Sequence, residues 1–378
     1  MTTQQRRAHF ERGSQAEWIA SLSPWPADGF GLRRMHRLLA ELGEPQRAYP
    51  ALHVVGTTGK GTTTRTIEET LAREGLLAGG YYSPHVTGWS ERIRVGGHEA
   101  DFEHAVARVR PAAERLGATQ FEILTAAALA EFAAAGVDAA AVEAGLGGRL
   151  DATNVLRTRV VVLTNVALEH TAVLGHTREA IAREKLAVVQ RRSTVVLGEQ
   201  DWEPIAREHE PRAIIVAASD NARELGGIAA SAFLGRDVEP VEARLPGRLE
   251  LRGDEIWDGA HTPEAVRYIA PKLPPIRAVV ASVLADKDVD GILHELARHA
   301  PAFVATESSN ARALAADELA ARARRHFIHV QIEPDPRTAV ARAHELGSPV
   351  LVTGSLYLLA DLYVREEESA RCRTLVSG

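Results

Sequence analysis

The sequence predicts an α/β protein with two domains, each built on a mostly parallel β-sheet. Three observations favour this class. Short apolar runs rich in β-branched residues alternate with helix-like patterns through most of the 378 residues, as they do in βαβ units. A loop rich in glycine and threonine joins the first apolar run to a helical pattern. Residues 239–247, with two prolines and one glycine, interrupt the alternation, which then restarts.

The first domain is predicted over residues 1–243, as a P-loop domain with a doubly wound, mostly parallel sheet. Each expected strand is a short apolar run, and each expected helix has helix-like spacing of its apolar residues. The elements, in chain order, are strand 51–55, helix 62–73, strand 78–82, helices 101–116 and 119–135, strands 139–143 and 160–164, helix 178–188, and strands 194–197 and 213–216.

The second domain is predicted over residues 244–378, as a smaller Rossmann-like α/β domain. Its alternation of strand and helix is shorter but has the same order. The expected elements are strand 278–283, helix 291–299, strand 302–306, helix 317–325 and strand 350–353.

Composition excludes several classes of protein. A hydrophobic fraction of 45% and a charged fraction of 25% are ordinary for a soluble globular chain. A single cysteine, Cys372, forms no internal disulfide and no cysteine-rich zinc site. Residues 1–11 are polar, and no apolar run is long enough to cross a membrane. The net charge of −6 argues against general nucleic-acid binding. We therefore expect a cytoplasmic protein with neither membrane nor nucleic acid as partner.

Lysine is unusually rare in this chain. Of the 44 basic residues only four are lysines, which leaves 40 arginines. The lysines are Lys60, Lys185, Lys272 and Lys287. Either these four are chance survivors of a bias toward arginine, or their positions require an amine.

A candidate phosphate-binding loop follows the strand 51–55. Residues 56–63 read Gly-Thr-Thr-Gly-Lys-Gly-Thr-Thr and open a helix, so backbone N–H groups and Lys60 are available to an anion. The general P-loop pattern has a Ser or Thr directly after the lysine as a Mg²⁺ ligand, but this chain has Gly61. Thr62 and Ser83 are the candidate substitutes. Ser83 is the better one, because it lies at the end of the next predicted strand.

Several further motifs follow in order along residues 31–365. No single motif is specific, but together they resemble the folylpolyglutamate synthase and dihydrofolate synthase family, within the Mur-ligase superfamily. The motifs are His53-Val-Val-Gly-Thr-Thr-Gly-Lys-Gly-Thr62, Tyr82-Ser-Pro-His85, Glu91-Arg-Ile-Arg-Val95, Phe121-Glu-Ile-Leu-Thr125, Val142-Glu-Ala-Gly-Leu-Gly-Gly-Arg-Leu-Asp-Ala-Thr-Asn154, Leu168-Glu-His-Thr171, Arg183-Glu-Lys185, Pro246-Gly-Arg-Leu-Glu250, Trp257-Asp-Gly-Ala-His261, Asp286-Lys-Asp288 and Thr353-Gly-Ser-Leu-Tyr357.

The resemblance implies an ATP-dependent amide ligase of folate biosynthesis and one-carbon metabolism. Such an enzyme phosphorylates the carboxylate of a folate-type acceptor, dihydropteroate or tetrahydrofolate. The amino group of L-glutamate then attacks the acyl phosphate. Both substrates are small molecules, and we expect a monomer. By resemblance the ATP-binding residues are Thr57, Thr58, Gly59, Lys60, Gly61, Thr62, Thr63, Asn154, Arg248, Asp258 and His261.

The resemblance also implies a metal site with one or two Mg²⁺ ions. Its ligands are Ser83, Glu143, His170 and a carbamylated Lys185, and Glu143, His170, Lys185 and Lys60 are the expected catalytic residues. Carbamylation needs an amine that can lose its proton, which arginine does not supply. The residues alone leave open a surface carboxylate at Glu143, a structural His170 and an ordinary exposed helix lysine at Lys185. A charged turn is equally open for residues 286–288.

Three departures from the family pattern bear on the substrate. Thr58 and Thr262 replace asparagines that are usual in the family. The segment 186–245 is shorter than in family members and lacks the leucine-glycine-histidine-glutamine loop, so residues 228–234 are interpreted as the remnant of the helix that follows it. Two alternatives therefore stand beside the folate ligase: the same chemistry on a non-folate carboxylate, and an inactive nucleotide-binding regulator.

Overall fold

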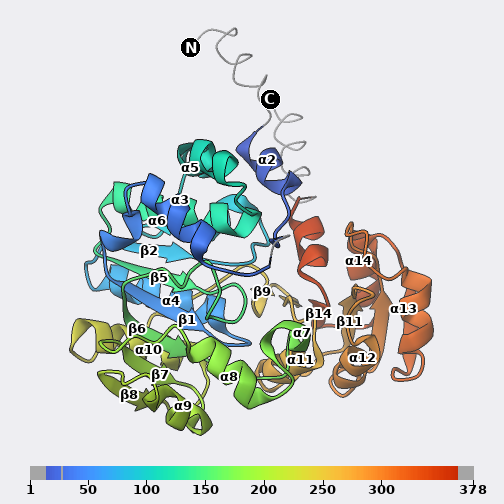
Figure 1. Ribbon diagram of the computed structural model, residues 1–378. Coiled ribbons are helices and arrows are strands. Elements are labelled where there is room, and N and C mark those ends of the chain that lie inside the picture. Colours follow the sequence, from blue (N-terminus) through green and yellow to red (C-terminus); the bar gives the residue numbers. More distant parts are fainter. Residues whose placement is uncertain (1–13, 27–28, 365–378) are drawn as a thin grey trace, which may run out of the picture. The chain divides into compact units, whose positions relative to one another are not determined.

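The computed structural model describes residues 14–26 and 29–364, so Cys372 and residues 1–11 lie outside the described residues. The chain divides into two compact units. The first runs to His85 and from Trp89 to Ala243, and the second combines Val86–Gly88 with the chain from Arg244 onward. Both are α/β, which confirms the predicted class (Figure 1). No described helix has the length and apolar character needed to span a membrane.

The first unit is built on an eight-stranded sheet in the order β4-β3-β2-β5-β1-β6-β7-β8. The six strands from β2 to β8 in this order pair in parallel, and β3 and β4 add antiparallel edge strands. The strands are β1 (Ala51–Val55), β2 (Ala78–Tyr81), β3 (Ile93–Val95), β4 (His98–Glu99), β5 (Ala139–Glu143), β6 (Thr158–Leu163), β7 (Thr194–Leu197) and β8 (Ala213–Val216).

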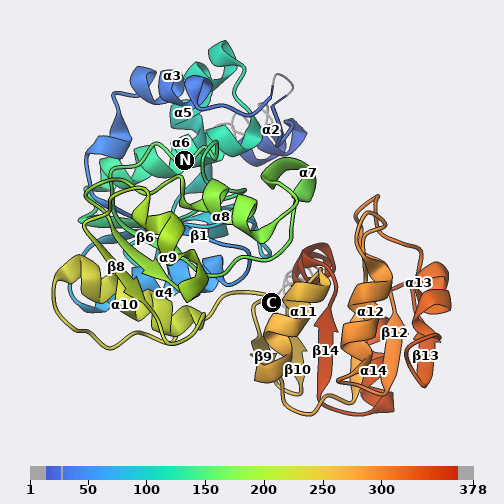
Figure 2. The ribbon, with the colours of Figure 1, turned by 60° about the horizontal axis from the view of Figure 1, so that its bottom comes forward.

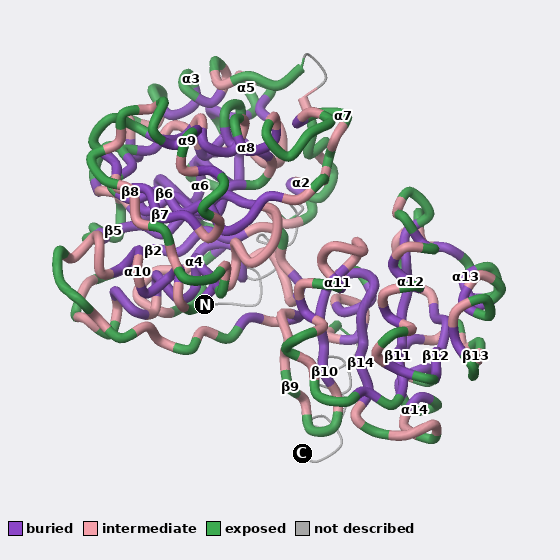
Figure 3. The backbone as a smooth tube through the Cα atoms, turned by 90° about the horizontal axis from the view of Figure 1, so that it is seen from below, coloured by how far each residue is buried: buried purple, intermediate pink, exposed green. Residues whose placement is uncertain are grey.

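Helices cover both faces of this sheet. On one face, α4 and α10 pack together over a core that includes Leu52, Val54, Ile67 and Leu225. On the other face lie α5 and α6 near β2, and α8 and α9 near β6 and β7. Figure 3 shows the buried strands inside this shell of partly exposed helices. The helices are α2 (Gln15–Ser21), α3 (Arg33–Glu41), α4 (Lys60–Arg73), α5 (Phe102–Leu116), α6 (Gln120–Ala135), α7 (Thr171–Leu174), α8 (Arg178–Leu186), α9 (Glu203–Arg207) and α10 (Ala222–Leu234), with short 3₁₀ turns at Pro45–Arg47, Trp89–Arg92 and Gln200–Trp202.

Two helices of the first unit begin earlier than the sequence predicts. The helix expected from residue 62 begins at Lys60, because Gly59 adopts the left-handed conformation (φ 80°) and caps it. Residues 228–234 are not a remnant, since α10 is a complete helix of 13 residues, capped by Asn221, whose side chain accepts from the amides of Arg223 and Glu224. Residues 217–221 alone connect β8 to α10.

The second unit is built on a six-stranded sheet in the order β13-β12-β11-β14-β10-β9, with only β9 antiparallel to its neighbour. Helices α11, α12 and α13 cover one face, and α14 packs on the other (Figure 2). The elements are β9 (Glu250–Arg252), β10 (Glu255–Trp257), α11 (Pro263–Ile269), a 3₁₀ turn (Ala270–Lys272), β11 (Ala278–Ala281), α12 (Val289–Ala297), β12 (Ala302–Ala305), α13 (Ala316–Ala323), β13 (His329–Ile332), α14 (Pro336–Leu346) and β14 (Val350–Thr353).

Candidate active site

The loop between β1 and α4 has the geometry that binds phosphate. Gly56 has φ 147° and lies against Thr164, so a Cβ at position 56 would collide with the Thr164 hydroxyl. Gly59 caps the helix, and the amide of Thr63 donates to the carbonyl of Gly59 at 2.9 Å. The amide groups of the first helical turn have no partner within the helix, so this end of α4 is suited to an anion.

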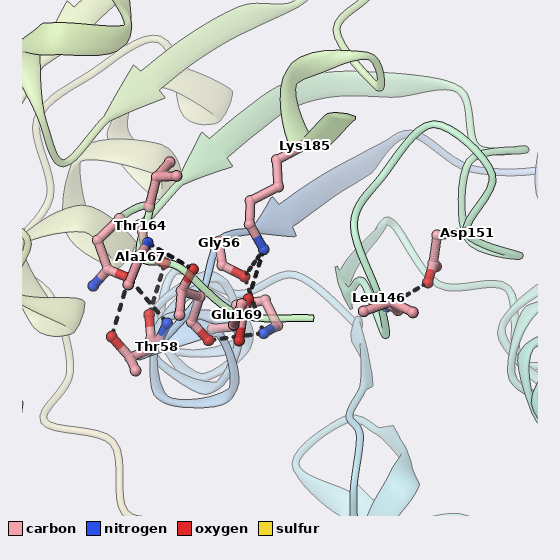
Figure 4. A network of polar contacts seen from close by, with 12 residues as sticks. Gly56, Thr58, Leu146, Asp151, Thr164, Ala167, Glu169 and Lys185 are labelled. Carbon is pink, nitrogen blue, oxygen red and sulfur yellow. Dashed lines mark hydrogen bonds and ion pairs between the residues drawn. The ribbon is translucent and has the colours of Figure 1, made fainter. Parts of the chain in front are cut away.

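The segment that follows β6 holds this loop in place (Figure 4). Asn165 Oδ1 accepts from both the amide and the hydroxyl of Thr58, at 2.9 and 3.0 Å. The Thr164 hydroxyl donates to the Thr58 carbonyl at 2.7 Å, and the amide of Ala167 donates to the Thr57 hydroxyl at 3.0 Å. Asn165 is not among the residues predicted from the sequence, although it lies three residues before the motif that begins at Leu168.

Two lysine side chains converge on one carbonyl of the loop. Lys60 Nζ donates to the carbonyls of Gly56 and Thr57, both at 3.1 Å. Lys185 Nζ reaches the same Gly56 carbonyl at 2.7 Å from α8, and it donates to Glu169 Oε1 at 2.9 Å (Figure 4). The structure thus brings together two lysines that lie 125 positions apart in the sequence.

Lys185 is not an exposed helix lysine. Its side chain is 1% exposed. Burial lowers its pKa to about 8 from the ordinary value of 10.5, against the opposing effect of the Glu169 carboxylate. Burial alone would raise the pKa of Glu169, but Lys185 and Lys60 lower it. Glu169 is therefore an ionised partner of the buried amine, and its place in the motif Leu168-Glu-His-Thr171 is the only signal for it in the sequence.

The glycine-rich motif of residues 142–154 packs against the helix that carries Lys185. A Cβ at Gly148 would come within 2.6 Å of the Lys185 carbonyl oxygen, so only glycine permits this approach. The amide of Arg149 donates to the Glu184 carbonyl at 3.0 Å. Asn154, an expected ATP contact, donates within its own loop to the Arg149 carbonyl at 3.0 Å.

Ser83 and Glu143 meet at the ends of neighbouring strands. Glu143 is the last residue of β5 and is buried, which excludes the surface carboxylate that the sequence left open. Its Oε2 accepts from the amide of Ser83, just beyond β2, at 3.0 Å. The register pairs Val54 of β1 with Glu143, so this carboxylate lies beside the strand that leads into the phosphate loop.

The donors at this sheet edge fit Mg²⁺, which prefers oxygen ligands. Mg²⁺ in nucleotide sites is commonly held by one or two protein carboxylates together with substrate phosphates. Glu143 supplies a carboxylate and Ser83 a hydroxyl. Among residues 14–26 and 29–364, no group of three or more His, Cys, Asp or Glu side chains forms a metal cage by itself. Ser83 and Glu143 are therefore suited to share the ion with nucleotide phosphates.

His170 lies next to Glu169 and directly precedes α7 as its N-cap residue. It is exposed and adopts a left-handed backbone conformation (φ 46°), which is uncommon for a residue with a side chain. Its imidazole is one of the groups that lower the pKa of Glu169. The structure thus places His170 beside the Glu169–Lys185 pair, on the same connection between β6 and α8.

The expected nucleotide residues of the second unit gather at the end of β10. Asp258 is buried, and its carboxylate accepts from the amides of Leu249 and Ala260, both at 2.8 Å. Burial raises the pKa of Asp258, and the Arg248 guanidinium opposes this shift. His261 Nδ1 donates to the Gly259 carbonyl at 2.8 Å.

Two further features of the second unit explain residues that the sequence left open. Thr262, which replaces an asparagine, caps α11 by accepting from the amide of Ala265 at 3.2 Å, a role that both residue types fill. In the 286–288 triplet, Asp288 caps α12 through the amide of Gly291 at 3.0 Å. Asp286 forms an exposed ion pair with Arg312 at 3.5 Å.

Comparisons with known proteins agree with this arrangement. Residues 54–233 match the Mur ligase middle domain, and residues 247–356 match the Mur ligase, glutamate ligase domain. The two units therefore define a ligase of the Mur type. The dihydrofolate synthase/folylpolyglutamate synthase of Escherichia coli strain K12 is 32% identical over 334 residues, which are 74% of this chain and 78% of that protein. This chain belongs to the same dihydrofolate synthase/folylpolyglutamate synthase family, so the resemblance of its motifs is confirmed.

Solved structures of this family have the same fold. E. coli FolC in complex with DHPP and ADP superposes with a TM-score of 0.83 at 28% identity, over 95% of this chain and 98% of that one. The bifunctional enzyme of Yersinia pestis, complexed with AMPPNP and Mn ion, gives a TM-score of 0.81 at 27% identity, over 94% and 98%. These relatives bind an adenine nucleotide, and the second also binds a divalent cation.

Proposed function

We propose that this chain is an ATP- and Mg²⁺-dependent ligase that joins L-glutamate to a folate-type carboxylate through an acyl phosphate. The observation that carries the proposal is the convergence of Lys60 and Lys185 on the Gly56 carbonyl. Lys60 alone would fit any P-loop enzyme. A second, fully buried amine with a lowered pKa, in a chain that also matches a glutamate ligase domain, favours a Mur-type ligase over a simple P-loop kinase.

The phosphate loop and Lys60 would stabilise the phosphoryl group during its transfer. A free carboxylate is a poor electrophile, so the acceptor needs a phosphate as leaving group before an amine can attack it. Negative charge on the transferred phosphoryl oxygens is the main demand of this step. The loop amides, the start of α4 and the Lys60 ammonium supply positive potential there without moving.

Mg²⁺ would neutralise phosphate charge when bound. Ser83 and Glu143 are the proposed ligands, with His170 and a carbamylated Lys185 at a second position. In carbamylation the neutral amine of Lys185 forms an N–C bond to CO₂ and releases one proton. The product carries a negative charge and two oxygen atoms in place of a positive amine. It therefore turns a group that repels Mg²⁺ into one that binds it.

One structural observation favours a second candidate, the same chemistry on a non-folate carboxylate. Residues 217–221 connect β8 directly to α10, so the first unit has no room there for the additional small strands that the family resemblance places near the acceptor. The groups proposed for nucleotide and metal are unaffected by this shortening. The acceptor is accordingly the part of the proposal that most needs a direct test.

The test is ADP release from ATP in the presence of Mg²⁺, L-glutamate and either dihydropteroate or tetrahydrofolate. We expect acceptor-dependent release with at least one of them, and its loss in Lys60→Ala. Release with neither would remove the folate assignment. Thermal stabilisation by other carboxylates, in the presence of a nucleotide, would then identify the alternative acceptor. The inactive regulator is excluded if Lys60→Ala abolishes a measurable turnover.

A further inference from the structure

A buried cluster of charged side chains lies beside the helix that follows the phosphate loop. Glu68, on α4, is completely buried. Its carboxylate accepts a hydrogen bond from the Tyr82 phenol and another from Arg94 Nε at 3.2 Å, and it lies 3.6 Å from Arg65 Nε. A buried carboxylate is tolerated only when it is paired and hydrogen-bonded, as this one is. The cluster is absent from the site residues that the sequence indicated.

Tyr82 joins this cluster to the candidate metal ligand Ser83. It follows β2, is 1% exposed and precedes Ser83 directly. The Arg65 guanidinium lies over the Tyr82 ring, 4.7 Å from the ring centroid. The backbone amide of Tyr82 donates to the Arg92 carbonyl at 3.0 Å. Ring, hydroxyl and backbone of Tyr82 are thus all held.

The chain makes specific room for the contact between Tyr82 and Glu68. Gly80 lies two residues before Tyr82, on β2, and packs against the same carboxylate. A Cβ at position 80 would collide with Glu68 Oε2 and would lie 2.6 Å from the Tyr82 hydroxyl oxygen. Since φ of Gly80 is not in the left-handed region, the reason for glycine here is space rather than backbone conformation.

Ser83 is therefore held from two directions. On one side its neighbour Tyr82 is bonded to α4, the helix that begins at Lys60. On the other side its own amide donates to Glu143 Oε2 of β5 at 3.0 Å. The peptide unit between Tyr82 and Ser83 is planar and stiff, so fixing the tyrosine also limits the orientation of the serine.

We propose that Tyr82 is a positioning residue that fixes the Ser83 hydroxyl, through its hydrogen bond to Glu68, at the distance from the phosphate loop that a bound divalent cation requires. This inference rests on the proposed function, in which Ser83 is a metal ligand. In this proposal Tyr82, which is buried against Glu68, acts on the cation only through Ser83. Its removal is therefore expected to weaken metal binding and to leave metal-free nucleotide binding unchanged.

The test is the affinity for Mn²⁺, measured by the loss of the free-ion electron paramagnetic resonance signal as protein with bound ADP is added. Tyr82→Phe keeps the ring and removes only the hydroxyl. We expect the dissociation constant for Mn²⁺ to be about tenfold larger in this variant, which is the usual effect of losing one hydrogen bond. Its dissociation constant for ADP without metal should equal that of the unaltered chain.

Tyr49→Phe is the matched control, because it also removes one buried phenol from the first unit. The Tyr49 hydroxyl donates to the Leu129 carbonyl at 3.0 Å and belongs to the core that includes α5 and α6. Both variants should unfold at a slightly lower temperature, but only Tyr82→Phe should bind Mn²⁺ more weakly. Equal Mn²⁺ affinity in the two variants would overturn the positioning role.

Ser83→Ala separates this inference from the proposed function. If Ser83→Ala weakens Mn²⁺ binding and Tyr82→Phe does not, the positioning role is wrong while the metal site stands. If the unaltered chain binds no Mn²⁺ with ADP, the proposed function fails and takes this inference with it. Faster hydrogen exchange at the amides of Tyr82 and Ser83 in Tyr82→Phe, measured without metal, is the independent expectation, and unchanged exchange would contradict the positioning role.

Discussion

Replacement of Lys185 tests the chemistry of the candidate site most directly. The pKa of about 8 means that this amine is about 9% neutral at pH 7, against about 0.03% for an ordinary lysine, a gain of about 300-fold. Only the neutral amine reacts with CO₂. Because the neutral fraction rises about 50-fold between pH 6 and pH 8, the rate of carbamylation at a fixed CO₂ concentration should rise by the same factor.

Lys185→Arg keeps the positive charge and removes the reactive amine, so we expect most ATP turnover to be lost. Since a guanidinium is larger than the fully buried ammonium, Lys185→Met serves as a second variant, with similar volume and no amine. The assay is ADP release after CO₂ depletion and after CO₂ is restored, with ¹³CO₂ labelling to detect the carbamate by NMR. Lys272→Arg is the control, because Lys272 is exposed and its cation–π contact with Tyr268 suits either cation. Near-normal turnover in Lys185→Arg would refute the reasoning. A ¹³C carbamate signal in Lys185→Arg as strong as in the unaltered chain would refute it as well.

Three other predictions concern the first unit. Lys60→Arg should lower kcat at least about 100-fold without unfolding the chain, because the compact ammonium donates to two loop carbonyls; normal ADP release would contradict this. Burial lowers the pKa of His53 to about 3, so stability is full above pH 6.5 and falls as the pH drops toward 3. The free energy of unfolding, measured with urea, should be about 2 kcal/mol lower at pH 5, and His53→Asn should make it less dependent on pH. The same pH dependence in His53→Asn and in the unaltered chain would contradict this prediction. Gly80→Ala should destabilise the fold by about 1–3 kcal/mol through its collision with Glu68, whereas Gly31→Ala, in open space, should change stability by less than about 0.5 kcal/mol; equal melting temperatures would exclude the collision.

The sequence predicts the buried strands of the fold well and several short elements poorly. The strands 51–55, 139–143 and 194–197 have the predicted bounds, because parallel strands covered on both faces are continuous apolar runs. The edge strand 213–216 also has its predicted bounds, although none of its residues is buried. The hairpin of β3 and β4 was overlooked, since strands of three and two residues carry no periodicity. Strands β9 and β10 are equally short. Helix α3 was also not predicted, although its buried residues Met35, Leu38 and Leu39 have helical spacing.

The candidate site is predictable only where a motif fixes a residue's neighbours along the chain. The loop with Lys60 is of this kind, and so is Glu143 at the end of a strand. The contacts of Lys185 and the cluster around Glu68 join residues far apart in the sequence. From the sequence alone, a glutamate in a helix such as Glu68 is predicted to be a solvated charge. Only the fold shows that Tyr82 and Arg94 contact it. The signal that could have found Glu68 is Gly80, a glycine within a strand, which often marks a close approach.

Two places where the sequence is expected to depart from the family pattern are physically connected in the structure. The Thr58 amide and hydroxyl both donate to Asn165 Oδ1, and Asn165 Nδ2 donates to Asp220 Oδ2 at 3.0 Å. Asp220 lies in the five-residue connection between β8 and α10, residues 217–221. The connection is tightly placed, since a Cβ at Gly198 would lie 3.2 Å from the Asp220 Cα. Because the Asn165 side-chain N–H donates to Asp220, Asn165 presents only its Oδ1 acceptor to Thr58. The threonine hydroxyl is a sufficient donor to this oxygen. Thr58 of the phosphate loop and the connection 217–221 are therefore two ends of one hydrogen-bonded chain, which explains how the loop is held.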